Sequence, residues 1–318
     1  MPRSSTSAER AVLVIVGLVA GLCIAEGVAR VVPDTFGDAN FALAGAGNRP
    51  ECVRPSLSRG YEPIPGTCGT DAEGARDYTA GLSGVPVRVM VVGDSLSTLG
   101  TWPAALAEAL AAGWQGSSVT VETYGVPGYN ACQELSMFRE TVATARPDVV
   151  VLQSCANDVQ GSPVLVQAGG WVSYFSDNAV VEFPEVLLRS RLLTTGVLAL
   201  APRTPMVSLG SGKAMAATCL RELHADAAGL GVELVAVLFP LFCPSDAPAL
   251  TLVDEVAMRR LLAESTIPFL DLRPAYEAAG PMLDHRDRPA DFIHPSRGGE
   301  QVAAKAIAAW MLGAVQGR

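Results

Sequence analysis

Residues 89–100 read VMVVGDSLSTLG, and the predicted fold follows from this stretch. Its first part is a run of apolar, mostly β-branched residues, which is typical of a buried strand. The run stops at Gly93, and Asp94 and Ser95 follow at once, before a segment of helical character. A serine in this place has one of two roles. It caps a helix as part of an ordinary turn, or it is a nucleophile presented at a strand end.

Strand-like and helix-like segments alternate through the rest of the chain. Several strands are unbroken apolar runs, which indicates a parallel sheet with helices on both faces, whereas the segment at 118–125 alternates like a strand. Five strands are expected, at 87–93, 118–125, 148–154, 232–240 and 267–272. Five helices are expected, at 101–114, 131–146, 212–231, 250–266 and 296–315. The predicted fold class is α/β, a three-layer αβα sandwich with a five-stranded, mostly parallel sheet. A longer, less regular stretch at 161–205 interrupts the alternation.

The composition restricts the class of partner. The chain has 318 residues, of which 49% are hydrophobic and 17% charged, enough to bury a sizeable core. Asp and Glu total 32 against 23 Lys and Arg, and the net charge is −9. Affinity for nucleic acid depends on neutralising phosphates with Lys and Arg. An acidic chain without a basic block is therefore not expected to bind nucleic acid.

Residues 1–32 resemble an export signal. Two arginines precede an uncharged apolar run at 11–25, and apolar character resumes after Glu26. We favour a single uncleaved N-terminal helix that anchors the chain in a bacterial cell membrane. The alternative is a signal peptide cleaved after Ala25, which would give a secreted or periplasmic protein. Both interpretations place the rest of the chain outside the cytoplasm.

Residues 33–85 are rich in Gly, Pro, Ser and Asn and lack sustained periodicity, so we expect a linker or irregular lead-in before a domain at 86–318. Within it, Cys52 and Cys68 bracket a loop and fit a disulfide in an oxidising compartment. The pairing of the later cysteines is left open. With three histidines and no CxxC pair, the chain has little from which to build a zinc site.

Polar and glycine residues gather where the predicted strands end. The first strand is followed by GDS, the second by the loop of YGVPGYN, the third by CAND, and the last strand and its loop by DFIHP. In open parallel sheets, sites form at the carboxyl ends of the strands. Four such loops together predict a functional site at that edge.

These blocks, in this order, resemble the SGNH or GDSL hydrolases of the membrane-anchored or secreted bacterial type. The resemblance extends from about residue 87 to the C-terminus and implies a flavodoxin-like SGNH hydrolase fold. It implies that Ser95 is the nucleophile and that His294 and Asp291 complete a catalytic triad.

The resemblance also implies an oxyanion hole. Its donors would be the backbone N–H of Ser95, the N–H of Gly128 and the side-chain amide of Asn157, with Gly125 as a less favoured choice of glycine. One position departs from the family pattern, because the third block usually begins with glycine and here begins with Cys155. A side chain there removes glycine's backbone freedom, which bears on the geometry of this loop.

The residues support this chemistry independently of the resemblance. A serine hydroxyl needs a base to take its proton, and three histidines are available. His294 is favoured, with Asp291 three residues earlier to orient its ring. His285 lies in a nearby charged loop and is the rival base, whereas His224 lies on a predicted helix and is interpreted as a surface residue.

The remaining positions also fit roles without chemistry. Gly128 and Asn157 suit ordinary turns, and Asp94 is expected to be structural, bonding to loop backbone. Cys155 is expected to be a buried small residue or the disulfide partner of Cys132. It is not expected to be a nucleophile, because no second base is evident beside it.

The predicted function is that of an extracytoplasmic serine hydrolase that cleaves an acyl ester through an acyl-enzyme, of the esterase, lipase or carbohydrate deacetylase type. No cofactor or metal is expected. The expected substrate is an acyl ester, with a cell-envelope glycan or lipid favoured. The alternatives are an O-acyltransferase with the same site and a non-catalytic glycan-binding or assembly module.

Overall fold

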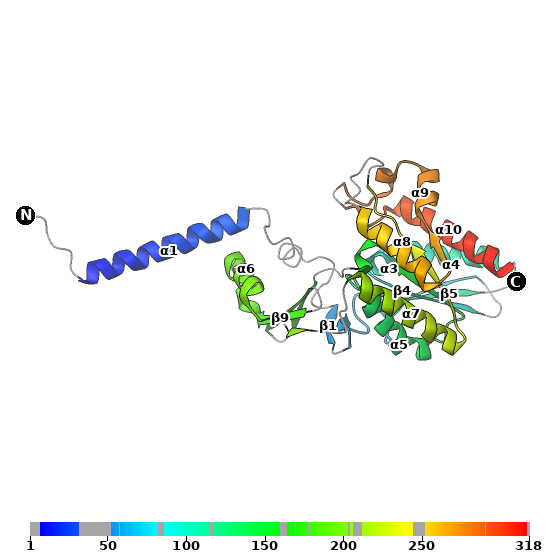
Figure 1. Cartoon of the computed structure of the whole chain (residues 1–318), viewed down its shortest axis with the longest axis horizontal. Coiled ribbons are helices and arrows are strands. Elements are labelled where there is room, and N and C mark those ends of the chain that lie inside the picture. Colours follow the sequence, from blue (N-terminus) through cyan, green and yellow to red (C-terminus); the bar gives the residue numbers. More distant parts are fainter. Residues whose placement is uncertain are drawn as a thin grey trace, which may run out of the picture.

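The computed structural model describes most of the chain and places a twisted sheet between two layers of helices (Figure 1). The described residues are 7–31, 52–56, 58–81, 86–114, 118–159, 164–168, 170–176, 179–202, 204–205, 212–243, 252–289 and 291–316. The predicted three-layer αβα architecture is confirmed.

The central sheet has six strands in the order β12-β11-β6-β4-β5-β3. Their bounds are β3 Arg76–Ala80, β4 Val87–Gly93, β5 Val119–Gly125, β6 Val149–Ser154, β11 Glu233–Leu238 and β12 Phe269–Asp271. The five predicted strands are all present and pair in parallel. The order of these five reverses between β4 and β6, and such a switch point is where sites form in doubly wound sheets.

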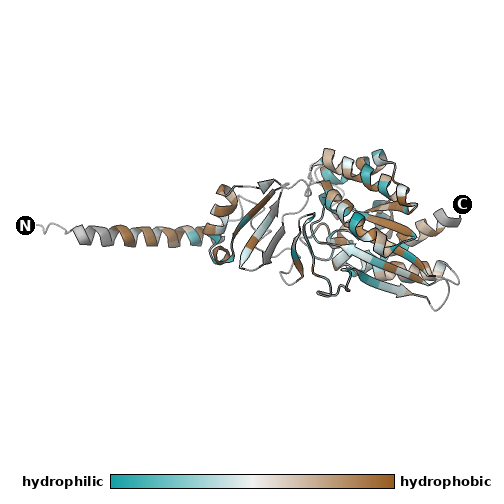
Figure 2. Ribbon diagram, turned by 90° about the horizontal axis from the view of Figure 1, so that it is seen from below, coloured by the Kyte–Doolittle hydropathy of each residue, from teal (hydrophilic) through white to brown (hydrophobic). Residues whose placement is uncertain are grey.

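Helices cover both faces of the sheet, and alternate strand residues point into two separate cores. One core packs α5, α7 and α8 against residues such as Val92 and Leu152. The other packs α4, α9 and α10 against residues such as Val91 and Val151. The helices are α4 Trp102–Gly113, α5 Ala131–Ala145, α7 Lys213–Leu230, α8 Val253–Ser265, α9 Arg273–Ala279 and α10 Arg297–Gln316. In Figure 2 the hydrophobic strands lie between these helices.

The stretch at 33–85 is more ordered than a linker, which corrects our expectation for its described part. Strands β1 (Val53–Ser56) and β2 (Gly60–Pro63) form an antiparallel hairpin, and β3 adds an antiparallel edge to the main sheet through β5. The predicted Cys52–Cys68 disulfide is present. These strands were not predicted because they are short and lack an apolar repeat. Residues 32–51, 57 and 82–85 lie outside the described part.

The interrupting stretch at 161–205 contains a second, smaller layer of structure. Its strands form an antiparallel sheet in the order β10-β9-β8-β7. The elements are β7 Val164–Ala168, β8 Trp171–Ser176, β9 Ala179–Pro184, the 3-10 helix η2 Glu185–Arg189, α6 Arg191–Leu200 and β10 Thr204–Pro205. Because this subdomain follows β6 and the 3-10 helix η1 (Ala156–Val159), it is attached at the carboxyl edge of the main sheet.

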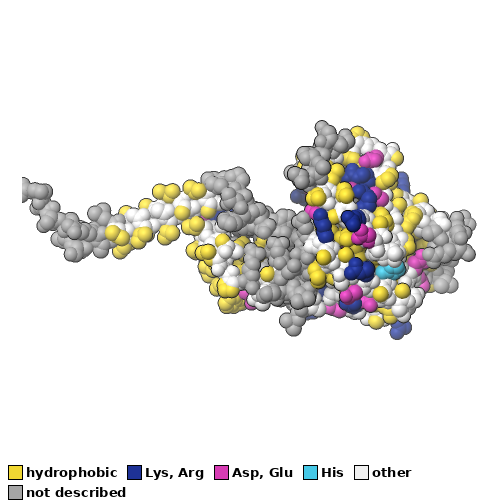
Figure 3. Space-filling model, in the orientation of Figure 1, with side chains coloured by type: hydrophobic (Ala, Val, Ile, Leu, Met, Phe, Trp, Pro, Cys, Tyr) yellow, Lys and Arg dark blue, Asp and Glu magenta, His cyan; other side chains and the backbone are white. Residues whose placement is uncertain are grey.

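Helix α1 (Ser7–Val31) lies outside the sandwich and meets the subdomain through its C-terminal end (Figures 1 and 2). The Glu26 carboxylate accepts hydrogen bonds from the Ser190 hydroxyl at 2.7 Å and from the backbone N–H groups of Arg191 and Leu192 at 2.9 Å each. The described side chains of α1 are mostly apolar and exposed, as Figure 3 shows. Among the helices as described, none meets the length and hydropathy of a membrane span.

Candidate active site

Ser95 stands at the end of β4, where the chain turns into the short helix α3 (Ser95–Leu99). Asp94 is the N-cap of this helix, and its Oδ1 accepts the Leu96 N–H at 2.9 Å. The cap is therefore Asp94, so the interpretation of Ser95 as a helix cap is wrong. Ser95 occupies the first turn of α3, where helix N–H groups have no partner within the helix.

A buried glutamine in β6 holds this turn in place. Gln153 Oε1 accepts the Asp94 N–H at 3.0 Å and the Ser97 hydroxyl at 2.7 Å. A Cβ at Gly93 would collide with the Gln153 side chain and with Ser97 Oγ, so glycine is required there for close approach. The role of Gln153 was not predicted, although a polar residue inside the apolar strand at 148–154 is a signal for it.

The loop before α10 brings His294 to Ser95. His294 Nε2 lies 2.8 Å from Ser95 Oγ, and His294 Nδ1 lies 2.9 Å from Asp291 Oδ2. Ser95 and His294 are 199 residues apart in sequence, so the tertiary fold makes this contact. Glu300 of α10, the helix that follows the His294 loop, accepts the N–H of Thr101 at 3.0 Å. Thr101 follows α3, so this bond connects the segment after His294 with the segment after Ser95.

The local turn prepares Asp291 to hold the imidazole. Its Oδ1 accepts the backbone N–H of Ile293 at 3.0 Å and that of His294 at 2.9 Å. Burial would raise the pKa of Asp291, but these two N–H groups and the His294 ring outweigh it and lower that pKa below its ordinary value. The carboxylate is thus ionised, and the arrangement can take a proton from the serine hydroxyl and stabilise the imidazolium that forms.

The other two histidines have structural contacts. His285, the rival base, is buried, its Nε2 lies 3.0 Å from the Tyr276 carbonyl, and its ring packs on the Tyr276 ring. His224 is half-buried, and its Nδ1 lies 3.0 Å from the Ser265 carbonyl oxygen. It is therefore not the free surface residue that the sequence suggested.

Asn157 lies in η1, directly after β6. Its Nδ2 donates to Asp94 Oδ2 at 2.8 Å. This bond fixes the orientation of the Asn157 amide. Asn157 is thereby held beside the turn that presents Ser95.

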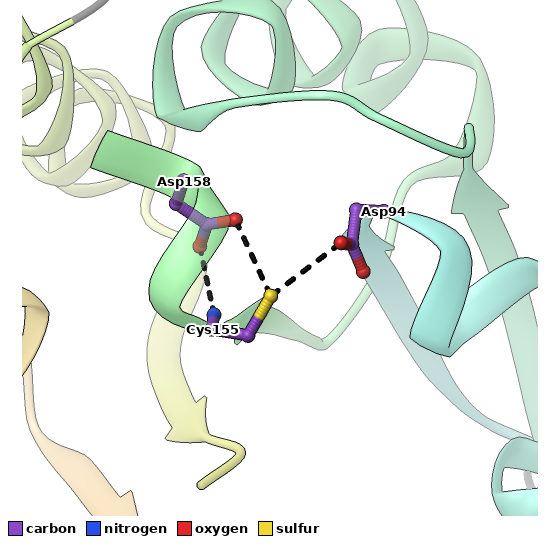
Figure 4. Close-up of side chains that lie close together, drawn as sticks. All are labelled: Asp94, Cys155 and Asp158. Atoms are coloured by element: carbon purple, nitrogen blue, oxygen red, sulfur yellow. Dashed lines mark hydrogen bonds between the residues drawn. The ribbon is translucent and has the colours of Figure 1, made fainter. Parts of the chain in front are cut away.

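Cys155 fits into this network in spite of the departure from glycine. Its φ is not among the positive values of the described residues, so the backbone here needs no glycine. The Cys155 thiol donates to Asn157 Oδ1 and lies 3.4 Å from Asp94 Oδ2 and 3.9 Å from Asp158 Oδ1 (Figure 4). Burial, then the charges of Asp94 and Asp158, raise the pKa of this thiol well above its ordinary value. Cys132 pairs with Cys219 instead, which excludes the suggested bond to Cys155.

The loop after β5 holds the two glycines considered for the second block. Gly128 has φ +84° and is followed by a Tyr129 N–H donating to the Val126 carbonyl at 3.1 Å, which is a turn with glycine in its third position. The Val126 N–H donates to the Gly93 carbonyl at 3.2 Å, so this turn adjoins the Ser95 turn. A Cβ at Gly125 would lie 2.9 Å from the Asp94 carbonyl oxygen, so Gly125 serves close packing.

Asp94, Asp158 and Glu134 are buried carboxyl groups whose charges interact. Burial, then nearby charge, raises the pKa of Glu134 and of Asp158 well above the ordinary values, and Asp94 contributes to both shifts. Neither carboxyl oxygen of Glu134 has a hydrogen-bond partner among the described residues. Burial thus favours the protonated form of both carboxyl groups. The sequence did not point to Glu134, which lies in a helix among ordinary charged positions.

Among the described residues, one cluster has ligand atoms close enough for a metal ion. Asp94, Cys155 and Asp158 have such atoms within 4.8 Å of one another. Their oxygen atoms already accept hydrogen bonds from Leu96, Asn157 and the Cys155 N–H, the last at 3.0 Å. We therefore interpret the cluster as a structural support for the two loops.

Solved structures of similar fold include several ester hydrolases. A lipase/acylhydrolase from Enterococcus faecalis is 15% identical with a TM-score of 0.47, covering 72% of this chain and 96% of that chain. LAE5, an α/β hydrolase enzyme from the metagenome of Lake Arreo, is 18% identical with a TM-score of 0.47 and the same coverage. Axe2, an acetylxylan esterase from Geobacillus stearothermophilus, is 16% identical with a TM-score of 0.47, covering 71% and 94%. Similarities this distant carry no argument about the substrate.

Among curated proteins, none matches this chain. A family profile described as the GDSL-like Lipase/Acylhydrolase family matches residues 90–302, which is about two thirds of the sequence. The matched region begins in β4, just before the Ser95 turn, and runs through the His294 loop into α10. The chain therefore belongs to the GDSL-like lipase/acylhydrolase family of ester hydrolases.

Proposed function

We propose that this hydrolase cleaves acyl esters with Ser95 as nucleophile, His294 as general base and acid, and Asp291 as the group that orients the imidazole. The observation that carries the proposal is the hydrogen-bonded chain from Ser95 Oγ through His294 to Asp291, at 2.8 and 2.9 Å. A nucleophile within hydrogen-bond reach of a base that a third group orients is the arrangement that serine acyl transfer requires.

In the proposed reaction, Ser95 Oγ attacks the ester carbonyl while His294 Nε2 takes the hydroxyl proton. The tetrahedral oxyanion is stabilised by the N–H groups of Ser95 and Gly128 and by the Asn157 amide. His294 then returns the proton to the leaving alcohol, and an acyl-enzyme on Ser95 remains. A water molecule, deprotonated by His294, attacks this ester and releases the acid and the free serine.

Hydrolysis of p-nitrophenyl esters from acetyl to long acyl chains tests the proposal. The full chain is compared with Ser95→Ala and with Ser58→Ala, which changes an exposed serine. We expect turnover to fall by a factor on the order of 10³ or more in Ser95→Ala and to stay unchanged in the control. A fluorophosphonate probe should label the wild type and not Ser95→Ala. Full activity in a folded Ser95→Ala protein would refute the mechanism.

The acyl acceptor is the second point to test, because an O-acyltransferase would use the same residues. Adding a polyol and measuring transfer against hydrolysis separates water from a sugar hydroxyl as acceptor. The hydrogen-bonded Ser95 and His294 give no support to the non-catalytic alternative.

We further propose that the enzyme works outside the cytoplasm and is attached to a membrane through α1, with acylated cell-envelope glycans or lipids as substrates. The support is the apolar run at 11–25 and the pairs Cys52–Cys68 and Cys132–Cys219, which suit an oxidising compartment. Fractionation of cells that express the full chain tests this proposal. Recovery in the cytosolic fraction with reduced cysteines would exclude it.

A further inference from the structure

We propose that Tyr61 is a positioning residue for the oxyanion hole. The inference rests on the proposed function, in which the Gly128 N–H is an oxyanion donor. The Tyr61 hydroxyl, from the hairpin β1–β2, donates to the carbonyl oxygen of Pro127 at 3.0 Å. That carbonyl and the Gly128 N–H belong to one planar peptide group, so the atom that Tyr61 holds and the proposed donor move together.

The direction of the bond suits this role. In a trans peptide the C=O and N–H point to opposite sides, and no cis peptide occurs among the described residues. With the Pro127 carbonyl held toward the hairpin, the Gly128 N–H points away from it. Donation to a carbonyl also polarises the peptide group, which makes its N–H a better donor. A preorganised donor of this kind stabilises the oxyanion without reorganising during the reaction.

The hairpin holds Tyr61 firmly. Tyr61 is 1% exposed, and its ring meets the edge of Tyr129 with centroids 5.2 Å apart. The Tyr129 hydroxyl donates back to the Tyr61 carbonyl at 2.5 Å, so loop and hairpin are joined in both directions. Helix α5 adds a further tie, because Gln133 Nε2 donates to the Arg59 carbonyl at 2.8 Å.

The hydroxyl is a donor throughout the working pH range. Burial, followed by the nearby Tyr129 and Asp94, raises the pKa of Tyr61 well above its ordinary value. The phenol is therefore neutral. A phenylalanine would fill the same space and remove the hydroxyl with its bond to Pro127, which separates packing from hydrogen bonding.

The test compares Tyr61→Phe with Tyr129→Phe in the purified full chain. Both changes remove one buried hydroxyl from the same pair of rings, but only the Tyr61 hydroxyl bonds to the peptide that carries the Gly128 N–H. We expect Tyr61→Phe to lower kcat by about 5- to 30-fold with KM nearly unchanged. The loss is smaller than the roughly 10²- to 10³-fold expected when an oxyanion donor itself is removed. The Tyr129 hydroxyl contacts the Gly128 peptide only indirectly, through the Tyr61 carbonyl, so Tyr129→Phe should lower kcat clearly less than Tyr61→Phe does.

A spectroscopic readout follows the peptide group directly. The chain has two Pro–Gly pairs, Pro65–Gly66 and Pro127–Gly128, so labelling proline carbonyls with ¹³C and glycine nitrogens with ¹⁵N selects two NMR cross-peaks. We expect Tyr61→Phe to shift the Gly128 peak and leave the Gly66 peak in place. In wild type, a phosphonate bound to Ser95 should move the Gly128 proton downfield.

The outcomes separate this inference from the proposed function. Loss of activity in Ser95→Ala with unchanged kcat in Tyr61→Phe would overturn the role of Tyr61 alone. Equal losses of kcat in Tyr61→Phe and Tyr129→Phe would show that both hydroxyls only stabilise the local structure, and would refute a specific role of Tyr61. If the Gly128 cross-peak of wild type does not shift when the phosphonate binds, the proposed role of Tyr61 is refuted without any variant. Activity retained in Ser95→Ala would instead reject the mechanism on which it rests.

Discussion

At the scale of single residues, the site depends on which groups the fold keeps charged. The N–H groups of Ile293 and His294 lower the pKa of Asp291, whereas burial raises the pKa of Glu134 and of Asp158. The pKa values of these carboxyl groups are thus shifted in opposite directions, because burial outweighs hydrogen bonding at Glu134 and Asp158 but not at Asp291. The two predictions at this scale concern these shifts.

Asp291→Asn should lower kcat by a factor on the order of 10³ to 10⁴, because an amide cannot stabilise the imidazolium. The folded pKa of Asp291 is lowered, so its contribution to stability is present above the unfolded value of 3.8 and is lost as the pH falls through the folded pKa. The variant should therefore melt below wild type at pH 7, and the gap should narrow toward pH 3. Asp287→Asn, an exposed control, should show neither effect. A gap that widens on acidification would contradict the assignment.

Glu134→Gln should stabilise the protein at alkaline pH. The folded pKa of Glu134 is raised above the unfolded 4.5, so the folded state binds an extra proton and loses stability as the pH rises from 4.5 toward the folded value. Glutamine carries no ionisable group, so the variant does not lose this stability as the pH rises. Thermal unfolding from pH 5 to 9 should show a gain for the variant that grows with pH, by roughly 2–4 °C for each kcal/mol.

The exposed Glu108 provides the matched control for this experiment. Glu108→Gln should follow the wild-type curve at every pH. A constant offset between Glu134→Gln and wild type would show that the charge of Glu134 is not the cause.

At the scale of elements, short loops are joined by contacts distant in sequence. The Ser95 turn is held by Gln153 of β6, and the turn at Gly128 by Tyr61 of β2. Helices α5 and α7 are joined by the disulfide Cys132–Cys219. Because α5 begins directly after the Gly128 loop, the disulfide restrains the end of that loop.

Replacing both Cys132 and Cys219 with alanine should lower the stability by roughly 2–4 kcal/mol, since the bond closes a long segment of 87 residues. Chemical denaturation under oxidising conditions measures the loss. Added reductant should lower the midpoint of wild type and change the variant less. If wild type under oxidising conditions unfolds like the variant, the bond does not form.

At the scale of the whole molecule, α1 is tied to the subdomain at the carboxyl edge of the sheet. Glu26 caps the N-terminus of α6 through Ser190, Arg191 and Leu192. A carboxylate there satisfies N–H groups that a helix leaves without partners and interacts favourably with the helix dipole. The contact couples the N-terminal helix to the catalytic domain through the subdomain.

Glu26→Gln should lower the stability of α6 by about 0.5–2 kcal/mol, the usual range for loss of a cap. Hydrogen–deuterium exchange should become faster in residues 191–200 and stay unchanged in β4 and β6. Glu185→Gln, which alters an exposed acid of the same subdomain, serves as control. Unchanged exchange in α6 would mean that α1 and α6 are not joined in solution.

The five parallel strands and the loops that carry Ser95, Asn157, Asp291 and His294 were predictable from sequence patterns alone. Apolar strands with polar residues at their carboxyl ends are local patterns, and the parallel topology brings such ends to one edge. The antiparallel strand β3 was not predicted because a short edge strand lacks a continuous apolar run.

The way in which the site is held became visible only in three dimensions. The bond of Gln153 to the Asp94 turn, the carboxyl groups of Glu134 and Asp158, and the contact of Tyr61 with Pro127 each join residues far apart in the chain or depend on complete burial. Sequence patterns report which face of an element is buried. They do not report which distant polar group shares that buried space, because this depends on packing that all the elements create together.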